Sequence, residues 1–297
     1  MPLHPQVRAE IESGTPVPLG ADTLAAARAD MLAGALSAAG PGTPVAEVSD
    51  VDASGTPVRL YLPDPTGVMP VALYLHSGGF VSGSVRTHDA ICRYLAVLSG
   101  AAIASVDYRL APEHPFPAAL DDITNAVEWL HRNGAERGID PQRLALVGDS
   151  AGGHLATVTA RRLRDIRVPV RSQVLVYPVL DPADPPTEVD SPALTPEEMA
   201  YCWNAYAPPG IDRDQPDLAP TTADLMGLPP TLVITAEYDI LRDAAEAYAD
   251  RLAEAGVPVA CVRYRGVPHS FYRKLARFDA ARQAVAQVAA TLRAELA

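Results

Sequence analysis

The chain has 297 residues, enough for one large α/β domain with a substantial core or for two small domains. Its formal net charge of −12 and its pI near 5.0 argue against nucleic acid or an anionic membrane surface as a main partner, because both reward clustered lysine and arginine. The three cysteines, Cys92, Cys202 and Cys261, are scattered without metal-like spacing, so we expect reduced thiols, no metal site and no cofactor.

Residues 1–10 contain two prolines, a histidine and an arginine but no apolar h-region, so the sequence predicts no secretory signal. No apolar run approaches the length needed to span a bilayer. We therefore expect a cytoplasmic protein without integral membrane association. The sequence does not decide the oligomeric state, and a homodimer stays open.

Short apolar runs rich in β-branched residues predict the strands. They cover residues 58–62, 71–76, 101–106, 144–147, 174–177, 232–235 and 259–264. Apolar residues at helical spacing lie between several of these runs, as over residues 120–130 and again over residues 245–255. Strands that alternate with helices predict an α/β fold with a mostly parallel central sheet and helices on both faces.

Two regions interrupt this alternation. Residues 1–45 include an alanine-rich amphipathic stretch before any strand, and residues 181–228 are rich in proline. We expect both to be additions to a core formed by residues 46–180 and 229–297. Additions at the carboxyl ends of strands commonly cover an active site, so these two regions are the candidate cap; packing alone is their alternative role.

Ser150 lies within Gly148-Asp149-Ser150-Ala151-Gly152, between the strand over 144–147 and a helical stretch over 153–165. Flanking glycines allow the tight strand-to-helix turn that lifts a serine hydroxyl clear of a sheet. The motif alone fits an ordinary capped turn equally well. A nucleophilic serine also needs a base and a group that orients the base.

His269 and Asp239 are the candidates for those two roles. His269 follows the last predicted strand through a short loop, and Asp239 follows the strand before it, so both lie at carboxyl ends of strands. Glu237, Asp243 and Asp181 are the alternatives for the acid. The order of serine, acid and histidine along the chain is that of α/β-hydrolases.

A glycine-rich loop, residues 76–80, follows the strand over 71–76. Its bare glycines allow backbone N–H groups to point into a cleft, so Gly78 and Gly79, together with the N–H of Ala151, can form an oxyanion hole. A simple glycine turn is the alternative. We expect His76 to hold the loop rather than to act as a second base.

These residues together resemble the hormone-sensitive lipase family of α/β-hydrolases, which includes many bacterial carboxylesterases. Five segments within residues 50–297 carry the resemblance: 76–80, 107–118, 148–153, 237–243 and 269–271. The resemblance implies an α/β-hydrolase fold with a helical cap, and it implies a triad of Ser150, Asp239 and His269. The chain departs from the family pattern at Ser77, where the family usually has glycine, and at His154, where it often has asparagine.

The expected function is that of a serine carboxylesterase, which hydrolyses short to medium acyl esters through an acyl-enzyme intermediate. Its partner is then a small-molecule ester. Cap side chains shape the acyl and alcohol pockets, and Trp203, Tyr206 and Phe271 are the candidates for this role. Acyl transfer to an alcohol or amine by the same triad is one alternative, and a non-catalytic ligand-binding protein on this fold is a more remote one.

Overall fold

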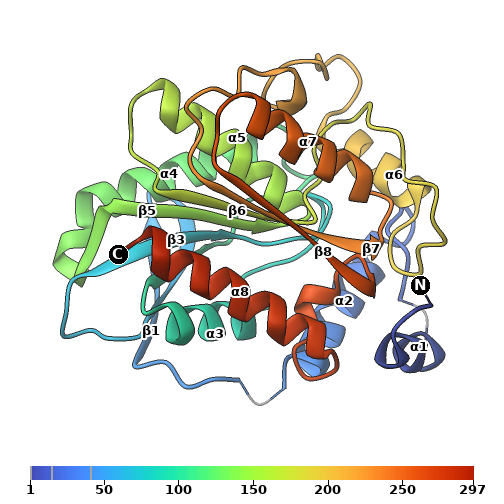
Figure 1. Ribbon diagram of the computed structural model, residues 1–297, viewed down its shortest axis with the longest axis horizontal. Coiled ribbons are helices and arrows are strands. Elements are labelled where there is room, and N and C mark those ends of the chain that lie inside the picture. The colour runs from blue at the N-terminus through green and yellow to red at the C-terminus, as the bar shows by residue number, and fades with distance from the viewer. Residues whose placement is uncertain (1, 15, 41) are drawn as a thin grey trace.

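The computed structural model describes residues 2–14, 16–40 and 42–297, and these form an eight-stranded central sheet flanked by helices (Figure 1). Neighbouring strands follow the order β1-β2-β4-β3-β5-β6-β7-β8. The strands are β1 (Glu47–Ala53), β2 (Thr56–Leu62), β3 (Met69–Leu75), β4 (Ala102–Val106), β5 (Ile139–Asp149), β6 (Ser172–Val176), β7 (Thr231–Tyr238) and β8 (Val259–Pro268).

Every strand pair from β4 to β8 is parallel, whereas β2 runs antiparallel to both of its neighbours. The central strands β3 to β6 are buried on both faces, which explains why they are continuous apolar runs in the sequence. The predicted α/β fold with a mostly parallel sheet is confirmed.

β1 is a strand that the sequence analysis did not predict. It pairs with β2 alone, through a turn at Ser54 and Gly55, where φ is 58° and 92°. Asp50 and Asp52 of this strand are exposed, as an edge position permits. Because the strand has little to bury, no apolar run marks it in the sequence.

Helices cover both faces of the sheet, as predicted (Figure 1). They are α3 (Asp89–Ser99) and α8 (Asp279–Glu295) on one face, and α4 (Ala118–Asn133), α5 (Ala151–Asp165) and α7 (Arg242–Glu254) on the other. β3 illustrates the division, because Val71 and Leu73 belong to the core under α4 and α5, whereas Ala72 and Tyr74 belong to the core under α3 and α8. No described helix is both long and apolar enough to cross a membrane.

The two regions predicted as additions, residues 1–45 and 181–228, contain three further helices. These are α1 (Pro5–Glu12), α2 (Leu24–Ala39) and α6 (Pro196–Tyr206). Figure 1 shows them near the carboxyl ends of β7 and β8. Three short 3₁₀ helices complete the described secondary structure: η1 (Gly134–Arg137), η2 (Pro220–Thr222) and η3 (Phe271–Arg273).

Specific contacts hold the N-terminal region in place. Arg28 of α2 donates to the carbonyl oxygen of Val81 at 2.7 Å and to both carboxylate oxygens of Glu113 at 2.7 Å. Glu198 of α6 accepts the backbone N–H of Leu19 at 3.0 Å. The N-terminal region is therefore fastened both to the core and to the insertion, at the side of the sheet where parallel strands end.

Candidate active site

Ser150 occupies the turn between β5 and α5, with φ 55° and ψ −117°, a region that residues other than glycine rarely adopt. The turn is closely packed. A Cβ on Gly152 would overlap the carbonyl oxygen of Leu75, and a Cβ on Gly148 would overlap that of Gly152. The Ser150 N–H donates to the carbonyl oxygen of Val176 at 2.9 Å. Both glycines are therefore required for the backbones to approach closely enough to hold the serine in this conformation.

Side chains from the ends of three strands meet at this turn. His269 follows β8, and its Nε2 lies 3.0 Å from Oγ of Ser150 while its Nδ1 lies 2.6 Å from Oδ2 of Asp239. The other carboxylate oxygen of Asp239 accepts the N–H of Leu241 at 3.0 Å. Asp239 is fully buried, and Ser150 and His269 are 4% and 5% exposed. The structure thus brings the three predicted triad residues together at distances suited to proton transfer from hydroxyl to imidazole.

The alternative acids are engaged in other contacts. Glu237 accepts the backbone N–H of Gly266 at 2.6 Å. Asp243 pairs with Arg242 at 2.7 Å, and Asp181 accepts a hydroxyl from the insertion. The acid that contacts the imidazole of His269 is Asp239.

The glycine loop, residues 76–80, lines the same cavity as Ser150. Gly78 and Gly79 have φ 132° and 61°, and a Cβ on either would overlap neighbouring atoms. Within the described part of the chain, the N–H groups of Gly78, Gly79 and Ala151 donate to no protein acceptor. Among the described residues these three amides are free to bind a ligand oxygen, as the donors of an oxyanion site are.

A cavity of about 230 Å³ extends from Ser150. Its wall combines the glycine loop and the loop after β8 with residues from both added regions. Apolar residues of this wall include Ile11, Met31, Ala35, Leu194, Met199 and Phe271. Both regions predicted as additions therefore border the space in front of the serine.

Trp203 and Tyr206, which we expected to shape the pocket, are not on the cavity wall formed by the described residues, whereas Phe271 is. Tyr206 stacks on Phe80 with ring centroids 4.1 Å apart, and Trp203 lies 5.2 Å from the same ring. α6 turns by about 100° per residue, so Cys202 reaches the cavity while the adjacent Trp203 packs behind the glycine loop. Sequence position alone does not fix this rotation.

A sequence profile described as alpha/beta hydrolase fold matches residues 72–273. The chain belongs to the α/β-hydrolase family. It is 40% identical over 251 residues to Carboxylesterase NlhH of Mycobacterium tuberculosis, a match that covers 81% of this chain and 78% of the relative. It is 38% identical over 256 residues to Ethyl acetate hydrolase of Pseudomonas putida, covering 82% and 80%.

Solved structures give the same result for this α/β-hydrolase. A hyperthermophilic esterase from the archaeon Pyrobaculum calidifontis superposes with a TM-score of 0.91 at 40% identity, over 99% of both chains. The esterase from Pseudomonas putida ECU1011 superposes with a TM-score of 0.89 at 34% identity, over 100% of this chain and 98% of the other. These relatives confirm the predicted fold and the predicted enzyme class, carboxylic ester hydrolase.

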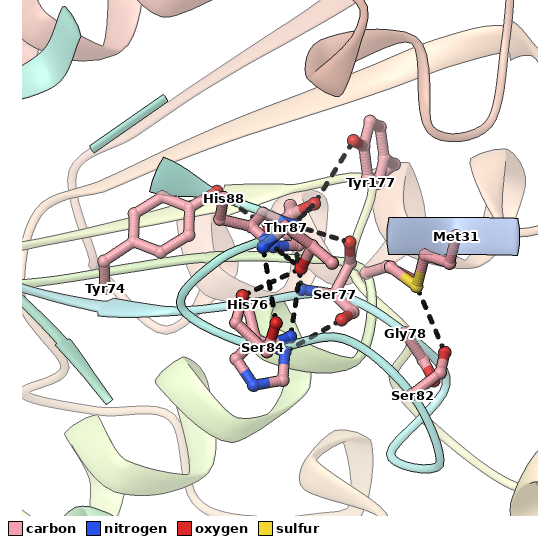
Figure 2. A network of polar contacts seen from close by, with 12 residues as sticks. Met31, Tyr74, His76, Ser77, Gly78, Ser82, Ser84, Thr87, His88 and Tyr177 are labelled. Carbon is pink, nitrogen blue, oxygen red and sulfur yellow. Dashed lines mark hydrogen bonds and ion pairs between the residues drawn. The ribbon is translucent and has the colours of Figure 1, made fainter. Parts of the chain in front are cut away.

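Ser77, where this hydrolase departs from the pattern it resembles, is anchored by a buried polar network (Figure 2). Its Oγ lies 3.0 Å from Nε2 of His88, and the same nitrogen lies 3.4 Å from Oδ2 of Asp149. The hydroxyl of Tyr74 donates to Oδ1 of Asp149 at 2.8 Å. Ser77 does not have the positive φ of the two glycines that follow, so a side chain is accommodated there. The network connects the glycine loop to the residue before Ser150.

Asp149 is fully buried. Burial raises the pKa of Asp149, but its electrostatic interaction with His88, hydrogen bonds from His88 and Ser77, and the charge of Arg273 outweigh burial and hold that pKa well below its ordinary value. The carboxylate therefore stays ionised beside the serine. The sequence analysis assigned no role to Asp149 or His88; Asp149 lay inside the elbow motif, but no spacing linked it to His88.

Two further histidines of the site, His76 and His154, are buried and have lowered pKa values. Burial lowers the pKa of His76 to about 3, and its ring stacks on Tyr108 at 4.1 Å, next to the glycine loop. Burial lowers the pKa of His154 to about 4, and its ring nitrogens lie 3.1 Å from the carbonyl oxygens of Leu180 and Asp217. His154 thereby joins α5 to the residue before the insertion and to Asp217 within it. Among the described residues, no group of three or more histidine, cysteine or acidic side chains is arranged to hold a metal ion.

Replacing His88 tests the importance of the network. The substitution His88→Phe keeps an aromatic ring but removes the contacts to Ser77 and Asp149, which leaves a buried carboxylate with fewer partners. We expect the free energy of unfolding to fall by about 3 kcal/mol, measured by denaturant unfolding. We also expect kcat on an aryl ester to fall more than KM rises, because the glycine loop loses an anchor.

Ser77→Ala is the milder comparison, since it removes one contact of His88 and the hydrogen bond of Ser77 to Asp149 but leaves the pairing of His88 with Asp149 in place. Its loss of stability should be about 1 kcal/mol. Equal stability of His88→Phe and the unmodified protein would contradict a supporting role for the network.

Proposed function

We propose that this chain is a serine carboxylesterase of the hormone-sensitive lipase group, which hydrolyses short to medium acyl esters through an acyl-enzyme. The observation that carries the proposal is the continuous contact from Ser150 through His269 to Asp239, together with three backbone amides that have no acceptor in the described part of the chain. Sequence segments 148–153 and 107–118 support the assignment to this group.

In the first half of the proposed reaction, Oγ of Ser150 attacks the ester carbonyl carbon and its proton passes to Nε2 of His269. Asp239 holds the imidazole by its Nδ1 and stabilises the imidazolium. The N–H groups of Gly78, Gly79 and Ala151 bind the oxyanion of the tetrahedral intermediate. The imidazolium then protonates the departing alkoxide, and an alcohol leaves.

In the second half, a water molecule attacks the acyl-serine carbonyl while His269 accepts the proton of that water. The tetrahedral intermediate collapses, the proton returns to Oγ of Ser150, and a carboxylic acid leaves. The sum is one ester and one water converted to one alcohol and one acid, with the protein restored.

The cap assignment belongs to the same proposal. Residues 1–45 and 181–228 would cover the site, and their contributions to the cavity wall support this. The cavity volume of about 230 Å³ favours small acyl groups, since it is below the usual range for drug-sized ligands. The relative named Ethyl acetate hydrolase also supports a short acyl preference. A cytoplasmic location and the lack of nucleic-acid partners stay predictions, and the oligomeric state stays undecided.

The triad assignment predicts the effect of three substitutions on hydrolysis of an aryl ester such as p-nitrophenyl butyrate. Ser150→Ala, His269→Ala and Asp239→Asn should each lower kcat by about 10⁴-fold or more. His114→Ala is the matched control, because His114 is an exposed histidine outside the site. Full activity of Ser150→Ala would contradict the mechanism, and circular dichroism checks that each variant is folded.

The acyl preference predicts the outcome of a chain-length series. Steady-state kinetics on p-nitrophenyl esters should give a maximum of kcat/KM at or below about eight acyl carbons, because longer chains exceed the cavity. A maximum at long chains would refute the short to medium preference. Product analysis with an added alcohol acceptor then distinguishes hydrolysis from acyl transfer.

A further inference from the structure

Among the described residues, Arg273 is the charged residue of the active-site cavity whose side chain makes no hydrogen bond or ion pair. The acidic and basic side chains on the cavity wall belong to Glu10, Asp30, Glu198, Arg273 and Lys274. Glu10 pairs with Lys274, while Asp30 and Glu198 each accept a backbone N–H. In the described residues, the guanidinium of Arg273 contacts no acceptor, and its Nε is buried without a hydrogen bond.

Nε of Arg273 is buried without an acceptor among the described residues, and an anion bound in the cavity would supply one. A buried donor without an acceptor is costly, and the cost is larger for a charged group. Much of the surrounding wall is apolar, including Met31, Phe271 and Phe278, which strengthens any ion pair formed there. The fork of guanidinium N–H donors matches a carboxylate in a bidentate arrangement, which a lysine ammonium would not provide.

Arg273 lies on the cavity wall in the same segment of the chain as His269. It ends η3, which begins two residues after His269, so the two Cα atoms lie within about 12 Å of each other. Burial has the largest effect on the pKa of Asp149, and the charge of Arg273 is one of the interactions that lower it. Arg273 and Ser150 line one continuous cavity.

We propose that Arg273 binds a free carboxylate of the substrate, so that the preferred substrates are esters bearing a carboxylate, such as half-esters of dicarboxylic acids. The inference rests on the proposed esterase function. Arg273 does not take part in bond breaking. The same attack by Ser150 and water releases an alcohol and an acid, one of which carries the second carboxylate held by the guanidinium.

Arg273 could instead act by stabilising the carboxylate of Asp149, but Asp149 already has close partners. Tyr74 donates to it at 2.8 Å, and Nε2 of His88 lies 3.4 Å from its second oxygen. No hydrogen bond or ion pair joins Arg273 to Asp149 in the described residues. A role confined to Asp149 would affect all esters equally, whereas a substrate-binding role affects only acidic ones.

The test compares kcat/KM for matched acidic and neutral esters. One pair carries the acid on the acyl side, mono-p-nitrophenyl adipate against p-nitrophenyl hexanoate. The other carries it on the alcohol side, 4-carboxyphenyl butyrate against phenyl butyrate. In Arg273→Gln, the acid-to-neutral ratio should fall about tenfold or more for at least one pair, and the pair affected identifies the side that faces Arg273.

Arg282→Gln is the matched control, because it removes an equal charge from an exposed position on α8 that pairs with Asp279. Its ratios should stay within about twofold of the unmodified enzyme. The inference is overturned if Arg273→Gln leaves both acid-to-neutral ratios of kcat/KM unchanged, which includes an equal loss of activity on acidic and neutral esters. It is also overturned if Arg282→Gln lowers these ratios as much as Arg273→Gln does.

A binding measurement separates this inference from the proposed function. Calorimetry with adipate on Ser150→Ala, which needs no turnover, should give binding that is about tenfold weaker in Ser150→Ala/Arg273→Gln. Equal affinity of the two variants, or no binding to either, would overturn the anion site. Failure of the unmodified enzyme to hydrolyse any neutral ester would instead count against the esterase function.

Discussion

Close backbone contact at the end of β5 is the constraint on which the rest of this site depends. The backbone before and after Ser150 passes so near the carbonyl oxygens of Leu75 and Gly152 that only glycine fits at positions 148 and 152. This contact holds Ser150 at a positive φ at the start of α5, on the wall of the cavity. Because Leu75 is also the last residue of β3, the same contact fixes where the glycine loop begins.

The same backbone contact therefore positions both the nucleophile and the oxyanion amides, and the buried network around Asp149 stabilises this arrangement. Asp149 precedes Ser150, while Ser77 belongs to the glycine loop, and both contact the same nitrogen of His88. Asp149 ends β5, whereas its partners lie on β3 and in the chain between β3 and α3, so the buried carboxylate is stable only when these segments keep their relative position. This arrangement also explains how the glycine loop accommodates the side chain of Ser77.

The sequence predicted those parts of the fold in which burial requires apolar residues. Strands buried on both faces are continuous apolar runs, and the ends of those runs led to Ser150, Asp239 and His269. β1 was missed because an edge strand can carry exposed carboxylates such as Asp50 and Asp52. The pairing of His88 with Asp149 joins residues 61 positions apart, and no local pattern encodes it.

The lining of the cavity was the least predictable part of the site. Trp203 and Tyr206 were chosen because aromatic side chains in a cap commonly shape a pocket, yet the rotation of α6 turns them toward Phe80. The absence of a partner for Arg273 also depends on the distances of all acidic side chains from it, which only the fold determines. The sequence motifs identify the reacting groups of this protein, whereas the packing of the folded chain decides which side chains line the cavity and select the substrate.

The most direct test of the account is a crystal structure of the protein after reaction with an alkyl fluorophosphonate. The account predicts one covalent bond, to Oγ of Ser150, with the phosphoryl oxygen within hydrogen-bond distance of the N–H groups of Gly78, Gly79 and Ala151. A phosphonate attached to another residue, or a phosphoryl oxygen directed away from these three amides, would contradict it.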